Sequence, residues 1–190
     1  MTILALDPSS TCAGWAILRD DGQPPIAGVI AFPDGMDIIE RLDQIALDVR
    51  DLLPESRCPE IDAVVFERPE DSKRGKARQN FKARGHADMA HFGMAAGALY
   101  SEVKARLPGR RIYTPTPSQW VGRGRVPSSK GDPHKERRVR WVEHLYRMPE
   151  GALGPKTKAG NVADAVLMAR WGLNVASQDR LTSAKGAVKA

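Results

Sequence analysis

Cysteine is scarce in this sequence of 190 residues. Cys12 and Cys58 lie far apart, and neither belongs to a Cys-x-x-Cys pair, which excludes the usual spacing of a structural zinc site or a dithiol redox motif. We interpret both as reduced thiols. A chain of this length buries a sizeable core without such crosslinks, so we expect one domain.

Long apolar runs are also lacking. No segment approaches the roughly 20 apolar residues that a membrane helix needs, and the chain does not begin with a basic segment followed by an apolar one. The sequence therefore predicts a soluble, cytoplasmic protein with no membrane partner.

Acidic residues are outnumbered, with 23 aspartates and glutamates against 29 lysines and arginines and a net charge of +6. The excess is concentrated in two segments. Residues 73–84 contain six basic residues and no acid, and residues 123–147 contain eight basic residues and three acids. Such runs fit either a solvated surface or a nucleic-acid partner.

The apolar pattern predicts an α/β domain. The unbroken run 3–6 is typical of a strand buried on both faces, and 14–18 and 26–32 continue it as an antiparallel meander. Apolar residues recur with the helical period over 37–53, and 61–66 is the next strand. This order implies a right-handed crossover to a parallel neighbour.

The second half alternates helices with short strands. After a long polar segment, 68–85, a helix over 86–107 contains Gly93 and Gly97, which suggest close approach of the sheet or of a second subunit. The further predicted elements are a strand at 111–114, a short helix capped by Ser118, a basic loop at 122–133, a helix at 134–146 and a last helix at 162–175. We predict one domain over 1–176 and a flexible tail over 177–190.

Three acids occupy comparable settings: Asp7 at the end of the first strand, Glu67 at the end of the fourth, and Asp164 near the start of the last helix. Each alone fits an ordinary structural role in a turn, at a strand end or in a first helical turn. Parallel strands, however, bring their carboxyl ends to one sheet edge. Like charges converging there are costly unless divalent cations neutralise them, so the acids together predict a metal site.

Four segments in order carry a resemblance to a known family: 3–11 with 14–17, 63–67, 116–120 and 162–169. The set resembles the Holliday junction resolvases of the RuvC type, members of the RNase H-like nuclease superfamily. The resemblance implies an RNase H-like three-layer fold, with a five-stranded mixed sheet flanked by helices. It also implies a homodimer that nicks four-way junctions or other branched DNA symmetrically, using two Mg²⁺ ions per active site, with Mn²⁺ as the alternative.

The same resemblance assigns roles to single residues. Asp7 would bridge the two ions, and Glu67 and Asp164 would each hold one. The family usually has Asp or His three residues before the last aspartate, where this chain has Asn161, an amide that binds metal weakly and cannot act as a base. Either three acids suffice, or Asn161 replaces a native aspartate and silences the enzyme. Lys135 resembles a family lysine near the scissile phosphate.

A second departure follows Glu67, where Arg68-Pro69-Glu70 and the basic insert have no close counterpart in bacterial chromosomal members. This divergence resembles a phage-type resolvase, acting in a bacterium or a phage-infected host cell. We expect the basic segments to line one DNA path. The predicted DNA-binding residues are Lys73, Arg74, Lys76, Arg78, Lys82, Arg84, Arg123, Arg125, Lys130, Arg137 and Arg138.

Two other functions fit parts of the pattern. A non-catalytic nucleic-acid-binding module of the same fold is consistent with Asn161. An actin-like phosphotransferase begins with a similar motif, but it needs a second domain that 190 residues hardly provide, and the chain has no second phosphate loop.

Overall fold

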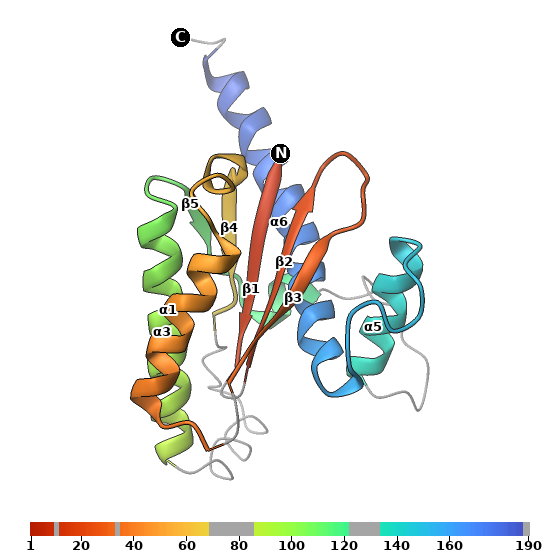
Figure 1. Ribbon diagram of the computed structural model, residues 1–190. Coiled ribbons are helices and arrows are strands. Elements are labelled where there is room, and N and C mark those ends of the chain that lie inside the picture. The colour runs from red at the N-terminus through yellow and green to blue at the C-terminus, as the bar shows by residue number, and fades with distance from the viewer. Residues whose placement is uncertain (10–11, 33–34, 69–85, 122–133, 188–190) are drawn as a thin grey trace.

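A five-stranded mixed sheet forms the centre of the molecule (Figure 1). The computed structural model describes residues 1–9, 12–32, 35–68, 86–121 and 134–187. The strand order is β3-β2-β1-β4-β5, with β1, β2 and β3 antiparallel and β4 and β5 parallel to β1. The predicted meander and parallel crossover are confirmed.

The described elements follow the predicted order. The strands are β1 (Thr2–Pro8), β2 (Cys12–Arg19), β3 (Ile26–Ala31), β4 (Ala63–Phe66) and β5 (Arg111–Tyr113). The helices are α1 (Ile38–Leu52), α3 (His86–Arg106), α4 (Pro117–Val121), α5 (His134–Leu145) and α6 (Lys156–Ala187), with a 3₁₀ turn η1 at Cys58–Glu60. The short helix α4 begins at Pro117, one residue before the predicted cap at Ser118, because proline suits the first helical position.

Helices cover both faces of the sheet. Figure 1 shows α1 and α3 on one face and α6 crossing the other, with α5 beyond α6. On β1, Leu4 and Leu6 belong to the core under α1 and α3, whereas Ile3 and Ala5 belong to the core under α6. Because successive strand residues alternate between faces, a strand buried on both faces is apolar without interruption. The expected three-layer α/β fold is confirmed.

Helix α6 is longer at both ends than its predicted range of 162–175. It begins after Pro155, whose carbonyl accepts from the Lys158 and Ala159 amides. Its far end is tied to the sheet, since the Tyr113 hydroxyl donates to Asp179 (2.9 Å) and Arg180 pairs with Asp62 (3.0 Å). The described part of the segment predicted as a flexible tail, from Ser177 through Ala187, is thus the last part of this helix. Apolar periodicity does not reveal polar side chains that pair with distant residues, so it underestimated the length of this helix.

Glycines let α6 approach the sheet closely. A Cβ on Gly14 of β2 would collide with the backbone carbonyl group of Asn161 on α6. A Cβ on Gly172 would collide with the Val65 side chain and would lie 3.1 Å from Ile3 Cγ2. By contrast, a Cβ on Gly93 or Gly97 of α3 would meet nothing within 4 Å among the residues the structure describes. The sheet therefore does not explain these last two glycines.

In the part of the chain that the structure describes, no helix is both long enough and apolar enough to cross a membrane.

Replacing Gly14 by alanine should lower the free energy of unfolding by about 1–3 kcal/mol, because the added methyl group meets helix backbone that cannot rotate away. Urea unfolding followed by circular dichroism would measure the change. Ser177→Ala, on the exposed surface of α6, is the control and should stay within about 0.5 kcal/mol of the parent. A Gly14→Ala protein as stable as the parent would show that the contact is not restrictive.

Candidate active site

Asp7 and Glu67 extend from neighbouring parallel strands toward the same face. In the register of β1 with β4, Ile3 pairs with Ala63 and Ala5 with Val65, and all four side chains lie in the core under α6. Asp7 and Glu67 continue this alternation by two residues, and the Glu67 amide donates to the Leu6 carbonyl at 3.1 Å. Both carboxylates therefore emerge on the α6 side of the sheet.

The predicted end of the first strand at Asp7 differs from the structure. Strand β1 continues to Pro8, and Asp7 lies opposite Gly14 of β2. Asp7 is thus held inside a paired strand, which fixes its backbone more firmly than a turn would.

Asp164 reaches the same place from α6. Gly14, opposite Asp7, lies under the backbone of Asn161, and Asp164 follows Asn161 by three residues on the same side of the helix. Asp164 is 6% exposed and has buried alanines on both sides, Ala163 and Ala165. It lies in the interior of α6, not in its first turn, so the expected role in the helix dipole does not apply.

Burial is the main cause of the raised pKa values of all three acids, and the charge of neighbouring carboxylates adds to it for Asp7 and Glu67. Burial is the main cause of the raised pKa of Asp7, followed by its hydrogen bond to Glu67 and by the charges of Glu67 and Asp164. The pKa of Glu67 is raised by burial and by Asp164, although the Asp7 hydrogen bond opposes the rise. The pKa of Asp164 is raised by burial against the opposing effect of Arg138 and Lys135. The Asp7–Glu67 hydrogen bond therefore raises the pKa of Asp7 and lowers that of Glu67.

Two cations of α5 enter this acidic site. Arg138 Nη1 lies 2.6 Å from Asp164 Oδ1, with the two side chains only 20% and 8% exposed. Lys135 Nζ donates to Asn161 Oδ1 at 2.6 Å, and the Lys135 stem packs against Gly160. The predicted catalytic lysine thus lies at the site. Arg138, predicted only as a surface DNA contact, is instead partly buried within it.

Asn161 uses both ends of its amide within the protein. Its oxygen accepts from Lys135, and its Nδ2 donates to the Cys12 thiol at 2.9 Å. It is 7% exposed and lies well inside α6, which excludes a helix-capping role. Asn161 therefore positions Lys135 in this arrangement, and Cys12 is a site residue that the sequence did not reveal.

Trp120 is a second site residue with no role predicted from the sequence, although it ends one of the segments that carry the family resemblance. Its ring supports Arg138, whose Cζ lies 5.3 Å from the ring centroid. Its buried Nε1 makes no hydrogen bond of normal geometry, but it is close enough to Glu67 to oppose the rise in that pKa. An isolated tryptophan in a short helix carries no signal that distinguishes this position from an ordinary core position.

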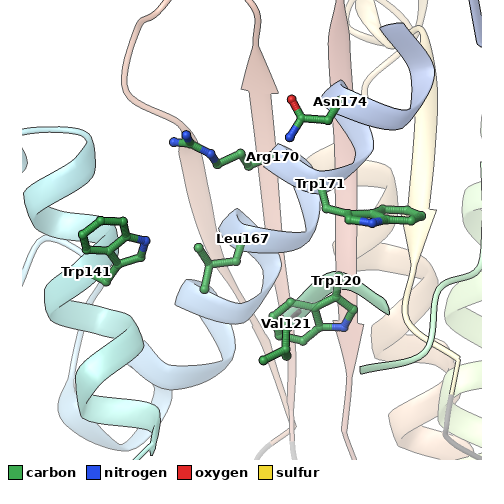
Figure 2. Close-up of a pocket in the computed structure, with 7 residues that line it drawn as sticks. All are labelled: Trp120, Val121, Trp141, Leu167, Arg170, Trp171 and Asn174. Atoms are coloured by element: carbon green, nitrogen blue, oxygen red, sulfur yellow. The ribbon is translucent and has the colours of Figure 1, made fainter. Parts of the chain in front are cut away.

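Trp120 also forms part of a neighbouring pocket of about 270 Å³ (Figure 2). The pocket lies between α4, α5 and α6 and continues along α6 from the turn after Asp164. Its lining residues are Trp120, Val121, Trp141, Leu167, Arg170, Trp171 and Asn174. Trp120 therefore contributes both to this pocket and to the surroundings of Arg138.

The donor set fits a hard divalent cation. Asp7, Glu67 and Asp164 offer only carboxylate oxygens, the ligand type that Mg²⁺ prefers, and burial raises the pKa of each. Among the described residues, no three His, Cys, Asp or Glu side chains are already arranged to hold an ion. Arg138 contacts an oxygen of Asp164 in this arrangement.

The other predicted DNA-binding residues are only partly within the described chain. Arg137 is half-buried on α5. The remaining ones lie outside the described residues: Lys73, Arg74, Lys76, Arg78, Lys82, Arg84, Arg123, Arg125 and Lys130.

In metal-free buffer, Asp7→Asn should be more stable than the parent at pH 7. A raised carboxyl pKa means that the native state binds more protons than the unfolded state above about pH 4, so the parent loses stability as the pH rises through that window. Asparagine does not titrate and still donates a hydrogen bond to Glu67. Urea unfolding in EDTA between pH 4 and 7.5 should show the smallest difference near pH 4; parallel curves would contradict the assignment.

Comparisons with known proteins find similarity in structure alone. No protein-family model and no curated protein sequence matches this chain. Thermus thermophilus RuvC in complex with a Holliday junction substrate matches with a TM-score of 0.60 and 20% identity, covering 89% of this chain and 90% of that chain. A second Thermus thermophilus RuvC structure matches with a TM-score of 0.58 and 20% identity, covering 89% and 91%. The fold of this chain is therefore the RNase H-like fold of the RuvC structures.

Proposed function

We propose that this chain is a structure-selective endonuclease that resolves four-way (Holliday) junctions by metal-dependent hydrolysis of phosphodiester bonds. The observation that carries the proposal is the convergence of Asp7, Glu67 and Asp164 from three separate elements onto one face of a RuvC-like sheet. A structural acid cluster without a ligand would destabilise the protein, since like charges are costly when buried together and Arg138 and Lys135 offset only part of that cost.

Each acid has a distinct part in this proposal. Asp7, whose carboxylate interacts with both other acids, would bridge two Mg²⁺ ions, and Glu67 and Asp164 would each hold one of them. Mn²⁺, which accepts the same oxygen ligands, is the alternative ion. Two ions bound in this way supply an activated water and stabilisation of the leaving oxygen.

Lys135 has the position of a phosphate-orienting residue. It lies on the first turn of α5, directly after residues 122–133, and Asn161 holds its ammonium group beside the acids. A positive charge fixed there would orient a phosphate group and stabilise negative charge that develops on it. Asn161 supports this role without acting as a base, and three acids then suffice for the reaction.

DNA would approach along the carboxyl ends of β1 and β4. The basic segment 73–84 follows Glu67 closely in the sequence, and the basic segment 123–138 leads into α5 and the site. Contacts of lysine and arginine with phosphates hold a duplex without reading its sequence, so the shape of the junction would decide selectivity.

The direct test is incubation of the protein with labelled four-way, three-way and linear duplexes, with and without Mg²⁺. We expect paired nicks in the four-way junction only when Mg²⁺ is present. Binding without cleavage in Mg²⁺ and Mn²⁺ would favour the non-catalytic module, and turnover of ATP would favour a phosphotransferase.

The amide variants Asp7→Asn, Glu67→Gln and Asp164→Asn should each lower cleavage in Mg²⁺ by about 100-fold, and Asp7→Asn and Glu67→Gln should leave junction binding in EDTA nearly unchanged. The reason is that each substitution removes a metal ligand of nearly the same shape and leaves the basic segments intact. Single-turnover cleavage and fluorescence anisotropy would measure the two effects. Lys135→Ala should reduce cleavage more than binding, and retained cleavage in any acid variant would remove that residue from the site.

We also propose a homodimer, because resolution requires nicks in two opposing strands. The face of α3 that carries Gly93, Met94 and Gly97 is exposed in the single chain, and Met94 is 44% exposed. Small residues on an exposed helix face allow two backbones to approach closely at a two-fold axis.

Gly97→Glu should convert the dimer to a monomer at micromolar concentration. The added side chain has open space within the chain and improves helix propensity, so the monomer should remain folded. Sedimentation velocity would give the oligomeric state and circular dichroism the fold. A monomeric parent, or a variant that remains dimeric, would contradict this interface.

A further inference from the structure

Arg138 makes an unusual contact for a residue beside a metal site. Its guanidinium group pairs with Asp164, one of the three carboxylates that would hold the ions, at 2.6 Å. Its charge also opposes the rise in the pKa of Glu67. An arginine does not lose its proton, so it competes with any other cation for the same oxygen.

The two cations of the site differ in their partners. Lys135 is bound to the neutral amide of Asn161, whereas Arg138 is bound to a buried carboxylate. An ion entering the site could leave Lys135 in place, but it has to share or take the Asp164 oxygen from Arg138. This makes Arg138 the residue whose position depends on the ion.

Trp120 limits where Arg138 can go when it leaves Asp164. The guanidinium carbon lies 5.3 Å from the centroid of this buried ring, and a cation over an indole face is stabilised there. A released Arg138 would therefore stay at the edge of the site. Its side chain is 20% exposed, and its planar fork of donors suits a phosphate group.

We propose that Arg138 is an exchangeable counter-cation: it holds Asp164 while the site contains no metal, and divalent-ion binding transfers it to a phosphate of the bound DNA. This inference rests on the proposed nuclease function and deepens it. The divalent ion would then have a second effect besides catalysis, because its binding would release Arg138 to contact the DNA. Metal binding and junction binding would then strengthen each other.

The first test is metal binding to the DNA-free protein. Isothermal titration with Mn²⁺ should give roughly tenfold tighter binding to Arg138→Gln than to the parent, because the competing cation is gone. The melting temperature in EDTA should fall in the same variant, since a buried carboxylate loses its partner. Arg140→Gln, on the exposed side of the same helix, is the matched control and should bind Mn²⁺ like the parent.

The second test is junction binding by anisotropy in EDTA and in Ca²⁺. Arg138→Gln should bind as tightly as the parent in EDTA, where Asp164 holds the arginine, and several-fold more weakly in Ca²⁺. Arg138→Lys keeps the charge but loses the planar fork, so its junction affinity in Ca²⁺ should lie between those of the parent and Arg138→Gln. This variant replaces Arg138→Gln in the test if the glutamine variant does not fold.

Three results would overturn the inference. Unchanged or weaker Mn²⁺ binding in Arg138→Gln would make the ion pair purely structural. Equal loss of junction binding in EDTA and Ca²⁺ would make Arg138 an ordinary phosphate contact. No loss in either condition would remove it from the DNA path. If the parent cleaves junctions and Arg138→Gln gives any of these results, the proposed function stands and only this inference is lost. If the parent neither binds Mn²⁺ nor cleaves junctions, both are lost.

Discussion

The close contact of α6 with the sheet determines the site. Gly14 on β2 leaves room for the backbone of Asn161 on α6, and Gly172 on α6 leaves room for Val65 on β4. Without these contacts Asp164 would stand farther from the carboxyl ends of β1 and β4, and three acids would be three separate surface charges. The alanine-rich stretch around Asp164 serves the same purpose, since short side chains allow a helix to lie close to a sheet.

The same contact creates an electrostatic cost. Three carboxylates share a partly desolvated space: burial raises the pKa of each, and the charge of a neighbouring acid raises those of Asp7 and Glu67 further. The chain offsets part of this cost with its own cations, Arg138 on Asp164 and Lys135 beside Asp7. A site that is destabilising when empty of ligand is the expected form of a functional site, because its charge is arranged for a partner and not for the fold.

Much of the core followed from local patterns. The unbroken apolar run before Asp7 indicated a strand buried on both faces, and the order of strands and helices indicated the parallel crossover. The alternation of side chains along a strand also indicates which way the acids point. Asp7 and Glu67 each stand an even number of positions after strand residues that face α6. The length of α6 did not follow from local patterns, because its far end is held by polar contacts with distant segments. Asp179 of α6 accepts from Tyr113, and Arg180 of α6 pairs with Asp62.

The sequence by itself determined the elements, their order and the three candidate acids, because apolar periodicity and strand ends are local properties of the chain. Only the tertiary structure decided what surrounds those acids. It put Arg138 on Asp164, placed Lys135 and Cys12 at the two ends of the Asn161 amide, and set Trp120 under the guanidinium group. These contacts join residues 18 to 149 positions apart, and no local pattern encodes them: they depend on how closely α5 and α6 pack onto the sheet.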